Sequence, residues 1–131
     1  MHRYTHVIGW GASTPKRVVT NHELARMLET DDEWIVSRTG IRERRISDHQ
    51  ETTASLAIDA ARQALDAADI RPDEIDLIIV ATSTPEHFFP STASLVQDAL
   101  GARNAGAFDL SAACTGFVYA ISVASQIIQS G

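Results

Sequence analysis

The run Leu77-Ile78-Ile79-Val80-Ala81 constrains the fold of this chain more than any other segment. An unbroken apolar stretch rich in β-branched residues is typical of a parallel strand that is covered on both faces. A helix pattern precedes it from Thr52 to Ala68, with apolar residues at helical spacing, and a second helix is predicted from Ser91 to Leu100. Gly101 is placed to end that second helix.

The alternation continues towards the end of the sequence. A short strand is predicted over Ala105 to Leu110, and a final helix from about Ala113 to Ser130, apolar enough to be largely buried. Strands that alternate with helices predict α/β architecture with a mixed, mainly parallel sheet. Few strands are visible, and the sequence stops where another should follow, so we expect part of a larger fold.

The first third of the chain carries shorter signals. Val7 to Gly11 predicts a strand, and Pro15 to Val19 a connection. Two capping boxes, Thr20 to Glu23 and Thr30 to Glu33, predict short helices. Gly40 should end the second of these helices.

Composition narrows the classes of protein to consider. The 131 residues include 44% hydrophobic residues and one cysteine, which suits a globular protein in a reducing compartment. No apolar run is long enough to span a membrane, and Met1 to His6 lack the apolar core of a signal peptide. We therefore expect a soluble cytoplasmic protein without a membrane partner.

Charge is unevenly distributed along the chain. The net charge of −6 argues against nucleic-acid binding, yet residues 38–45 contain four arginines and one glutamate, a local charge of +3. This cluster predicts a small anionic ligand or an acidic partner. The alternative is an ordinary solvated run of charges.

The segment Phe108 to Phe117 carries the most specific chemical signal. A strand leads through small residues to Cys114, at the expected start of a helix. A helix N-terminus favours the nucleophilic thiolate, and backbone N–H groups of such a turn can help to form an oxyanion hole. The arrangement predicts a nucleophile, as in other strand-turn-helix elbows. The alternative is a small buried hydrophobic residue, the commoner state of a lone cysteine.

Several motifs together resemble β-ketoacyl-acyl-carrier-protein synthase III, a condensing enzyme of the thiolase superfamily. They occur in the family's order along essentially the whole chain. The motifs are Asp32-Glu33-Trp34-Ile35, Arg38-Thr39-Gly40-Ile41-Arg42-Glu43-Arg44, Ile75-Asp76-Leu77-Ile78-Ile79-Val80-Ala81-Thr82, Phe89-Pro90-Ser91 and Ala112-Ala113-Cys114-Thr115-Gly116-Phe117. The resemblance implies that residues 1–131 are the N-terminal half-domain of a duplicated αβαβα architecture, incomplete and without its C-terminal half.

The resemblance also implies an activity. Such an acyltransferase condenses a starter acyl-CoA, here expected to be acetyl-CoA, with malonyl-acyl-carrier protein to give a β-ketoacyl-carrier protein in fatty-acid synthesis. A cysteine acyl-enzyme is the intermediate. The implied partners are acyl-CoA, the malonyl-carrier protein and a second copy of the protein in a homodimer. No metal or redox cofactor is implied.

Site residues are carried over by motif. Cys114 matches the nucleophile. For CoA, Trp34 matches a tryptophan that stacks on the adenine, Arg38 an arginine that contacts the nucleotide or its phosphates, and Thr30 a threonine near the same nucleotide. Trp34 and Arg38 are four residues apart and share a helix face. The alternatives are a core or hinge aromatic for Trp34, a surface ion pair for Arg38 and a helix cap for Thr30.

Phe89 matches a position that lines the partner's acyl pocket across the dimer, where a large side chain favours a short starter. The alternative for Phe89 is core packing. Three further arginines are candidates for the CoA entrance or for a carrier-protein surface: Arg42, Arg44 and Arg45.

The family's catalytic His and Asn belong to the half that is absent. None of the histidines present matches that role: His2, His6, His22, His49 and His87. We therefore expect the chain alone to be inactive, and exposed sheet edges and apolar faces to make it poorly soluble. It could be a truncation, one subunit of a split enzyme or a degenerate relative.

Other function classes stay open. Related condensing enzymes make polyketides, quinolones or long-chain ketones, and share the cysteine turn. A non-catalytic acyl-CoA-binding module would keep CoA affinity without Cys114. A purely structural subunit needs none of Cys114, Trp34 and Arg38, so their joint presence argues against it.

Overall fold

The computed structural model describes residues 4–131; His2 and the start of the segment used for the signal-peptide prediction lie outside this range. The chain divides into two units. We call residues 4–13 together with Thr53–Gly131 the sheet unit, and Thr14–Thr52 the hairpin unit.

A parallel strand pair forms the centre of the sheet unit. β3 (Leu77–Ala81) pairs with β4 (Gly106–Leu110), with Leu77 opposite Gly106 and Ala81 opposite Leu110. The two predicted strands and their parallel arrangement are confirmed. The apolar run of β3 fits this place because helices cover both of its faces.

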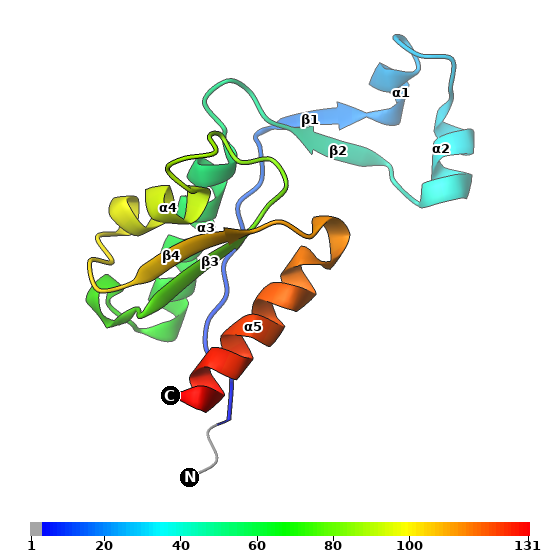
Figure 1. Ribbon diagram of the computed structural model, residues 1–131. Coiled ribbons are helices and arrows are strands. Elements are labelled where there is room, and N and C mark those ends of the chain that lie inside the picture. Colours follow the sequence, from blue (N-terminus) through cyan, green and yellow to red (C-terminus); the bar gives the residue numbers. More distant parts are fainter. Residues whose placement is uncertain (1–3) are drawn as a thin grey trace. The chain divides into compact units, whose positions relative to one another are not determined.

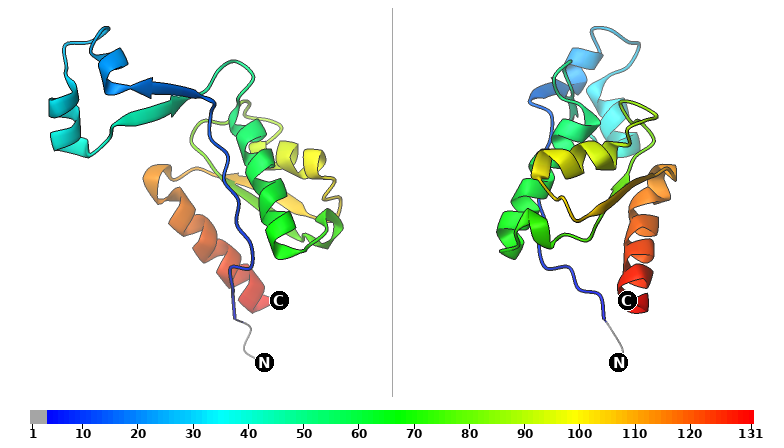
Figure 2. Two further views of the ribbon diagram at one scale, coloured as in Figure 1. Left: turned by 180° about the vertical axis from the view of Figure 1, so that it is seen from behind. Right: turned by 60° about the vertical axis from the view of Figure 1, so that its left-hand side comes forward.

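Three helices surround this pair (Figures 1 and 2). α4 (Thr92–Leu100) lies against one face and α5 (Gly116–Ser130) against the other, while α3 (Thr53–Ala68) packs on α4. All three were predicted, although α5 begins later than expected, after a 3-10 turn over Ala113–Thr115.

The helix starts in the sheet unit are fixed by side chains from elsewhere in the chain. Asp109, within β4, accepts the backbone N–H groups of Thr92 and Ala93, each at 2.8 Å. Glu86 accepts the N–H of Ala54 at 2.5 Å, close to the start of α3. Carboxylates at helix N-termini satisfy orphan N–H groups and complement the helix dipole. The strand and the loop before α4 therefore hold both helices in register.

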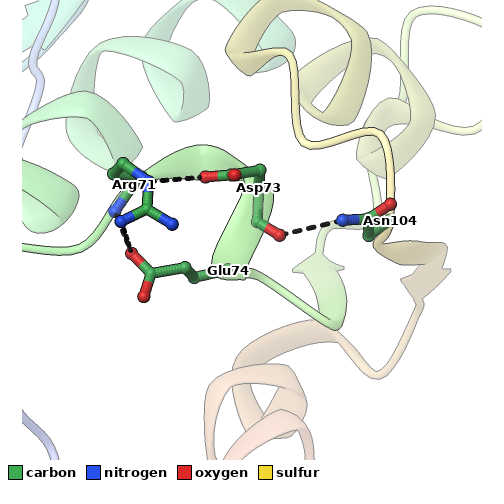
Figure 3. A network of polar contacts seen from close by, with 4 residues as sticks. All are labelled: Arg71, Asp73, Glu74 and Asn104. Carbon is green, nitrogen blue, oxygen red and sulfur yellow. Dashed lines mark hydrogen bonds and ion pairs between the residues drawn. The ribbon is translucent and has the colours of Figure 1, made fainter.

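A smaller polar network fixes the entry into β3 (Figure 3). The guanidinium of Arg71 bonds Asp73 at 3.0 Å and Glu74 at 3.3 Å, around the 3-10 turn Pro72–Glu74. The hydrogen bond and charge of Asp73, followed by the charge of Glu74, raise the pKa of Arg71. Asn104 donates to the Asp73 carbonyl at 3.0 Å and ties the turn to the loop before β4. These contacts hold the turn that precedes β3.

The strand predicted over Val7 to Gly11 is wrong. This segment is extended but has no strand neighbour among residues 4–131, and it runs along α3 instead. Gln63 of α3 donates to the carbonyl of Ala12 at 2.9 Å. Gly9 lies so close to α3 that an added Cβ would come within 2.8 Å of the Ala68 Cβ. Close packing of glycine on a helix replaces the expected sheet pairing.

The hairpin unit contains a strand pair that the sequence analysis missed. β1 (Arg17–Thr20) pairs antiparallel with β2 (Glu43–Ile46), so the connection predicted over Pro15 to Val19 is wrong. Val19 is buried and lies opposite Arg44. The mainly charged sequence of β2 hid the strand, because its residues show no apolar alternation.

Two short helices lie between these strands. α1 (Asn21–Leu24) is capped by Thr20, as predicted. α2 (Asp32–Thr39) ends at Gly40, whose φ of 72° suits glycine. The N-cap of α2 is Asp31, which accepts the Trp34 N–H at 2.7 Å, so Thr30 is not the cap.

Apolar side chains stay uncovered on the sheet unit. Phe117, Val118, Tyr119 and Ile121 of α5 are exposed, as are Val7, Ile8 and Trp10. The expectation that α5 is largely buried is wrong for this chain, because nothing in residues 4–131 packs on its outer face. The expected exposure of apolar faces is confirmed. None of the helices in the described part is both long and apolar enough to cross a bilayer.

Candidate active site

Cys114 lies in the 3-10 turn that joins β4 to α5, and its side chain is exposed. The alternative of a small buried hydrophobic residue is therefore wrong. Ala113, immediately before it, has a φ of 46°, in the left-handed region that non-glycine residues rarely adopt. Residues held in this region cost free energy and cluster at active sites and ligand-binding sites.

The backbone around Cys114 is tightly closed. Thr115 donates to the carbonyl of Ala112 through its N–H at 3.1 Å and through its hydroxyl at 2.7 Å. The N–H of Gly116 donates to the carbonyl of Ala113. A Cβ at Gly116 would lie 3.3 Å from the Cβ of Ala81, at the end of β3. A small residue at that position lets the turn approach the strand closely.

A separate pocket of about 590 Å³ lies within the hairpin unit. Leu24, Leu28 and Ile35 give it an apolar wall, and Trp34 lies beside them with 57% of its surface exposed. The alternative of a core aromatic for Trp34 is wrong. An exposed indole in a half-apolar pocket can accept a flat ring by stacking.

Thr30 lines the same pocket as Trp34. Its hydroxyl oxygen is buried and has no hydrogen-bond partner within residues 4–131. Buried polar groups in folded proteins are nearly always satisfied, so each exception needs an explanation. A ligand in the pocket would supply a hydrogen-bond partner for the Thr30 hydroxyl. Thr30 is not the N-cap of α2, because Asp31 has that role.

The four arginines of residues 38–45 differ in whether they line this pocket. Arg44 lines the pocket together with Thr30 and Trp34, whereas Arg38, Arg42 and Arg45 are not among its lining residues. Arg38 lies in the last turn of α2, and no ion pair to it occurs in the described chain, which removes the surface ion-pair reading. Its contact with a nucleotide stays a prediction. The sequence analysis named Arg44 as a candidate together with Arg42 and Arg45, but nothing in the sequence distinguished it from them.

Phe89 belongs to the loop between β3 and α4 and is 92% exposed. Core packing is thereby excluded for this side chain within the described chain. Its neighbour Phe88 is fully exposed as well, a feature that the motif comparison did not single out. His87, in the same loop, is exposed as expected for a solvated histidine.

Comparisons with known proteins agree with this geometry. Residues 108–131, which contain the Cys114 turn and α5, match the family model of 3-oxoacyl-[acyl-carrier-protein (ACP)] synthase III. The whole chain is 54% identical to the β-ketoacyl-[acyl-carrier-protein] synthase III of Methylococcus capsulatus and covers 41% of that protein. The chain thus spans less than half the length of the curated relatives it matches.

Solved structures give the same answer for the fold. The crystal structure of 3-oxoacyl-[acyl-carrier-protein] synthase III from Aquifex aeolicus matches with a TM-score of 0.92 and 52% identity, over 95% of this chain and 40% of that one. A priming β-ketosynthase from a polyketide biosynthetic pathway matches with a TM-score of 0.96 and 43% identity, over 99% of this chain and 39% of that one. The chain therefore has the thiolase-like fold of condensing enzymes.

Proposed function

Because this chain is related along its whole length to part of β-ketoacyl-acyl-carrier-protein synthase III, we propose that the full-length protein is an acyltransferase that starts fatty-acid chains. It condenses acetyl-CoA with malonyl-acyl-carrier protein and yields a β-ketoacyl-carrier protein. The observation that carries the proposal is the exposed Cys114 on a strained turn between a parallel strand and a helix.

In this mechanism the thiolate of Cys114 attacks the thioester carbon of acetyl-CoA. The carbon–sulfur bond to CoA breaks, and the acetyl group stays on the cysteine. CoA leaves as a thiolate and takes up the proton that the cysteine thiol gave up when it formed its thiolate. The N–H groups of Thr115 and Gly116 are engaged by carbonyls of the turn. The N–H of Cys114 itself is proposed as a donor to the oxyanion.

The second half of the reaction forms the new bond. The malonyl group loses carbon dioxide, and the electron pair released attacks the acetyl carbon on Cys114. The carbon–sulfur bond to the cysteine then breaks and regenerates the thiolate. The step needs no metal or redox cofactor. The resemblance assigns its His and Asn to the other half of the fold, so the isolated chain is proposed to be inactive.

The hairpin unit supplies substrate recognition in this proposal. Trp34 stacks on the adenine of CoA, Thr30 bonds the same nucleotide, and Arg38 contacts its phosphates. The exposed Trp34 and the unsatisfied Thr30 hydroxyl support these roles. Phe89, which is 92% exposed within the described chain, lines the acyl pocket of a second copy in a homodimer. The proposed location is the cytoplasm.

The acyl group found on the carrier protein after the reaction tests this function. The full-length protein is incubated with acetyl-CoA and malonyl-carrier protein, and the carrier is weighed by mass spectrometry. We expect an acetoacetyl carrier with release of carbon dioxide and free CoA. An unchanged malonyl carrier, together with unconsumed acetyl-CoA, would reject the proposal.

A second candidate is priming of a polyketide, favoured by the match to the priming β-ketosynthase. Both functions use the same cysteine turn. They are separated by offering carrier proteins of fatty-acid and polyketide type in one competition. Preference for the polyketide carrier would select the second candidate.

A further inference from the structure

Asn21 is the most completely buried polar side chain of the hairpin unit, with 1% of its surface exposed. Its side-chain NH₂ donates to the Asp32 carboxylate at 2.8 Å and to the Ile41 carbonyl at 2.7 Å. Its side-chain oxygen accepts from the Arg44 guanidinium at 2.9 Å. Both amide donors and the amide oxygen are thus engaged.

These partners fix the orientation of the Asn21 amide. The reverse orientation would place its oxygen against two acceptors, and its NH₂ against an arginine that can only donate. Asn21 therefore joins three separate parts of the unit in one arrangement. They are the first residue of α2, the connection after Gly40 and strand β2.

Two of these partners bear directly on the pocket. Asp32 opens α2, which carries Trp34 into the pocket, and Arg44 lines the pocket itself. Arg44 is half-buried, and no carboxylate in residues 4–131 forms an ion pair with it. One of its N–H groups is held by a neutral amide, so its charge stays available for an anion.

The pocket also contains two carboxylates, those of Glu29 and Asp31. Asp31 is engaged as the N-cap of α2. An anionic ligand therefore has to bind the guanidinium of Arg44 in a pocket that is also lined by the Glu29 carboxylate. This requirement makes the position of the Arg44 guanidinium decisive, because a mobile arginine could turn towards that carboxylate.

We infer that Asn21 is a positioning residue that holds Arg44 in the same pocket as Trp34, where Arg44 serves as a further phosphate contact for the proposed CoA nucleotide. This inference rests on the proposed function. Arginine suits a phosphate because its planar group donates several hydrogen bonds at once. Asn21 adds affinity by removing, before binding, rotamer freedom that Arg44 would otherwise lose on binding.

Arg45 provides a matched control. It follows Arg44 on β2, and successive strand residues point to opposite faces, so it lies across from Val18 and not from Val19. It is absent from the pocket lining, and within residues 4–131 its guanidinium donates to the carbonyls of Pro15 and Lys16, each at 3.4 Å. Arg45→Ala removes the same charge without touching the pocket.

The experiment measures CoA affinity of the full-length protein by calorimetry. The set comprises wild type, Arg44→Ala, Asn21→Ala, the double variant and Arg45→Ala. We expect Arg44→Ala to weaken binding about tenfold, as for loss of one charged hydrogen bond, and Arg45→Ala less than about twofold. The double variant should be no weaker than about twice the worse single variant, because Asn21 acts through Arg44.

Steady-state kinetics distinguish a positioning role of Asn21 from a general loss of structure. Asn21→Ala should raise KM for acetyl-CoA and leave kcat and the alkylation rate of Cys114 unchanged. If Asn21→Ala does not fold, Asn21→Ser replaces it, because its short side chain cannot reach both Asp32 and Arg44. It should raise KM for acetyl-CoA in the same way and leave kcat unchanged.

The possible results test the role of Asn21 separately from the proposed function. No CoA binding by wild type would reject the proposed function. Binding by wild type with equal affinities for Arg44→Ala and Arg45→Ala would overturn the inference alone. Fully additive losses for Asn21→Ala and Arg44→Ala would overturn the positioning role of Asn21.

Discussion

The two units present functional groups in different ways. In the sheet unit one continuous segment, from β4 through the 3-10 turn into α5, sets the position of Cys114. In the hairpin unit the pocket is assembled from residues 24–44, held together by the side chain of Asn21. A local turn can be recognised in a sequence as a motif, whereas a pocket built from separated side chains cannot.

The largest expected effect is the loss of chemistry in the sheet unit. Cys114→Ala should abolish acyl transfer, lowering the rate by more than about a thousandfold, because no other group takes the acyl chain. CoA affinity should be unchanged, since the proposed nucleotide contacts lie in the other unit. Acyl transfer is followed by release of CoA thiol, and affinity by calorimetry.

Two outcomes would break this division. Normal acyl transfer by Cys114→Ala would remove the cysteine from the mechanism. A fall in CoA affinity comparable to that of a pocket variant would show that nucleotide recognition is not confined to the hairpin unit.

The next effect concerns stability. Gly9→Ala should lower the free energy of unfolding by about 2 kcal/mol, since the new Cβ overlaps the Ala64 carbonyl of α3 and has no room to move. Gly40→Ala in the hairpin unit has open space around it, so only its left-handed backbone matters, about 1 kcal/mol. Urea unfolding measures both variants. Equal small losses would show that the N-terminal segment does not pack on α3.

The third effect tests the pocket. Trp34→Ala should weaken CoA binding about tenfold, the loss expected when one base loses an aromatic stacking partner. Trp10→Ala is the matched control, because it removes an exposed tryptophan from the sheet unit. Calorimetry with CoA compares the two variants. Equal affinities would leave Trp34 without a role in nucleotide binding.

The smallest effect concerns acyl-chain length. Phe89→Ala should raise the ratio of kcat/KM for butyryl-CoA over acetyl-CoA about threefold to tenfold, because it enlarges an apolar pocket. Phe88 is also exposed, and Phe88→Ala should leave this ratio unchanged. Both variants should fold as wild type does, since both side chains are exposed within the described chain. If only Phe88→Ala raised this ratio, Phe88 and not Phe89 would be the residue that lines the acyl pocket.

Much of the sheet unit could be predicted because its signals are local. The apolar run of β3, the helical spacing of α3 and the glycine after α4 each report an element directly. Val7 to Gly11 misled because extended apolar sequence does not say whether a strand or a helix lies beside it. The burial of α5 was overestimated for the same reason, since apolar side chains do not identify what covers them.

The hairpin unit was harder to predict because its contacts join residues that are distant in sequence. Pairing of Val19 with Arg44 and the bonds of Asn21 span more than one element, and no periodicity reports them. Motif resemblance named Trp34 and Thr30, which the structure brings together in one pocket, but it gave Arg44 no more weight than its neighbours. The N-cap of α2 is Asp31, although the predicted capping box began at Thr30.

The central claim is that the turn at Cys114 carries the acyl group. The direct test is mass spectrometry of the full-length protein after incubation with acetyl-CoA, followed by peptide mapping. The account predicts one acetyl group, on the peptide that contains Cys114 and on that residue. A protein that stays unacetylated while Cys114 remains open to alkylation would contradict it for acetyl-CoA, and acetylation at any other residue would contradict the assigned nucleophile.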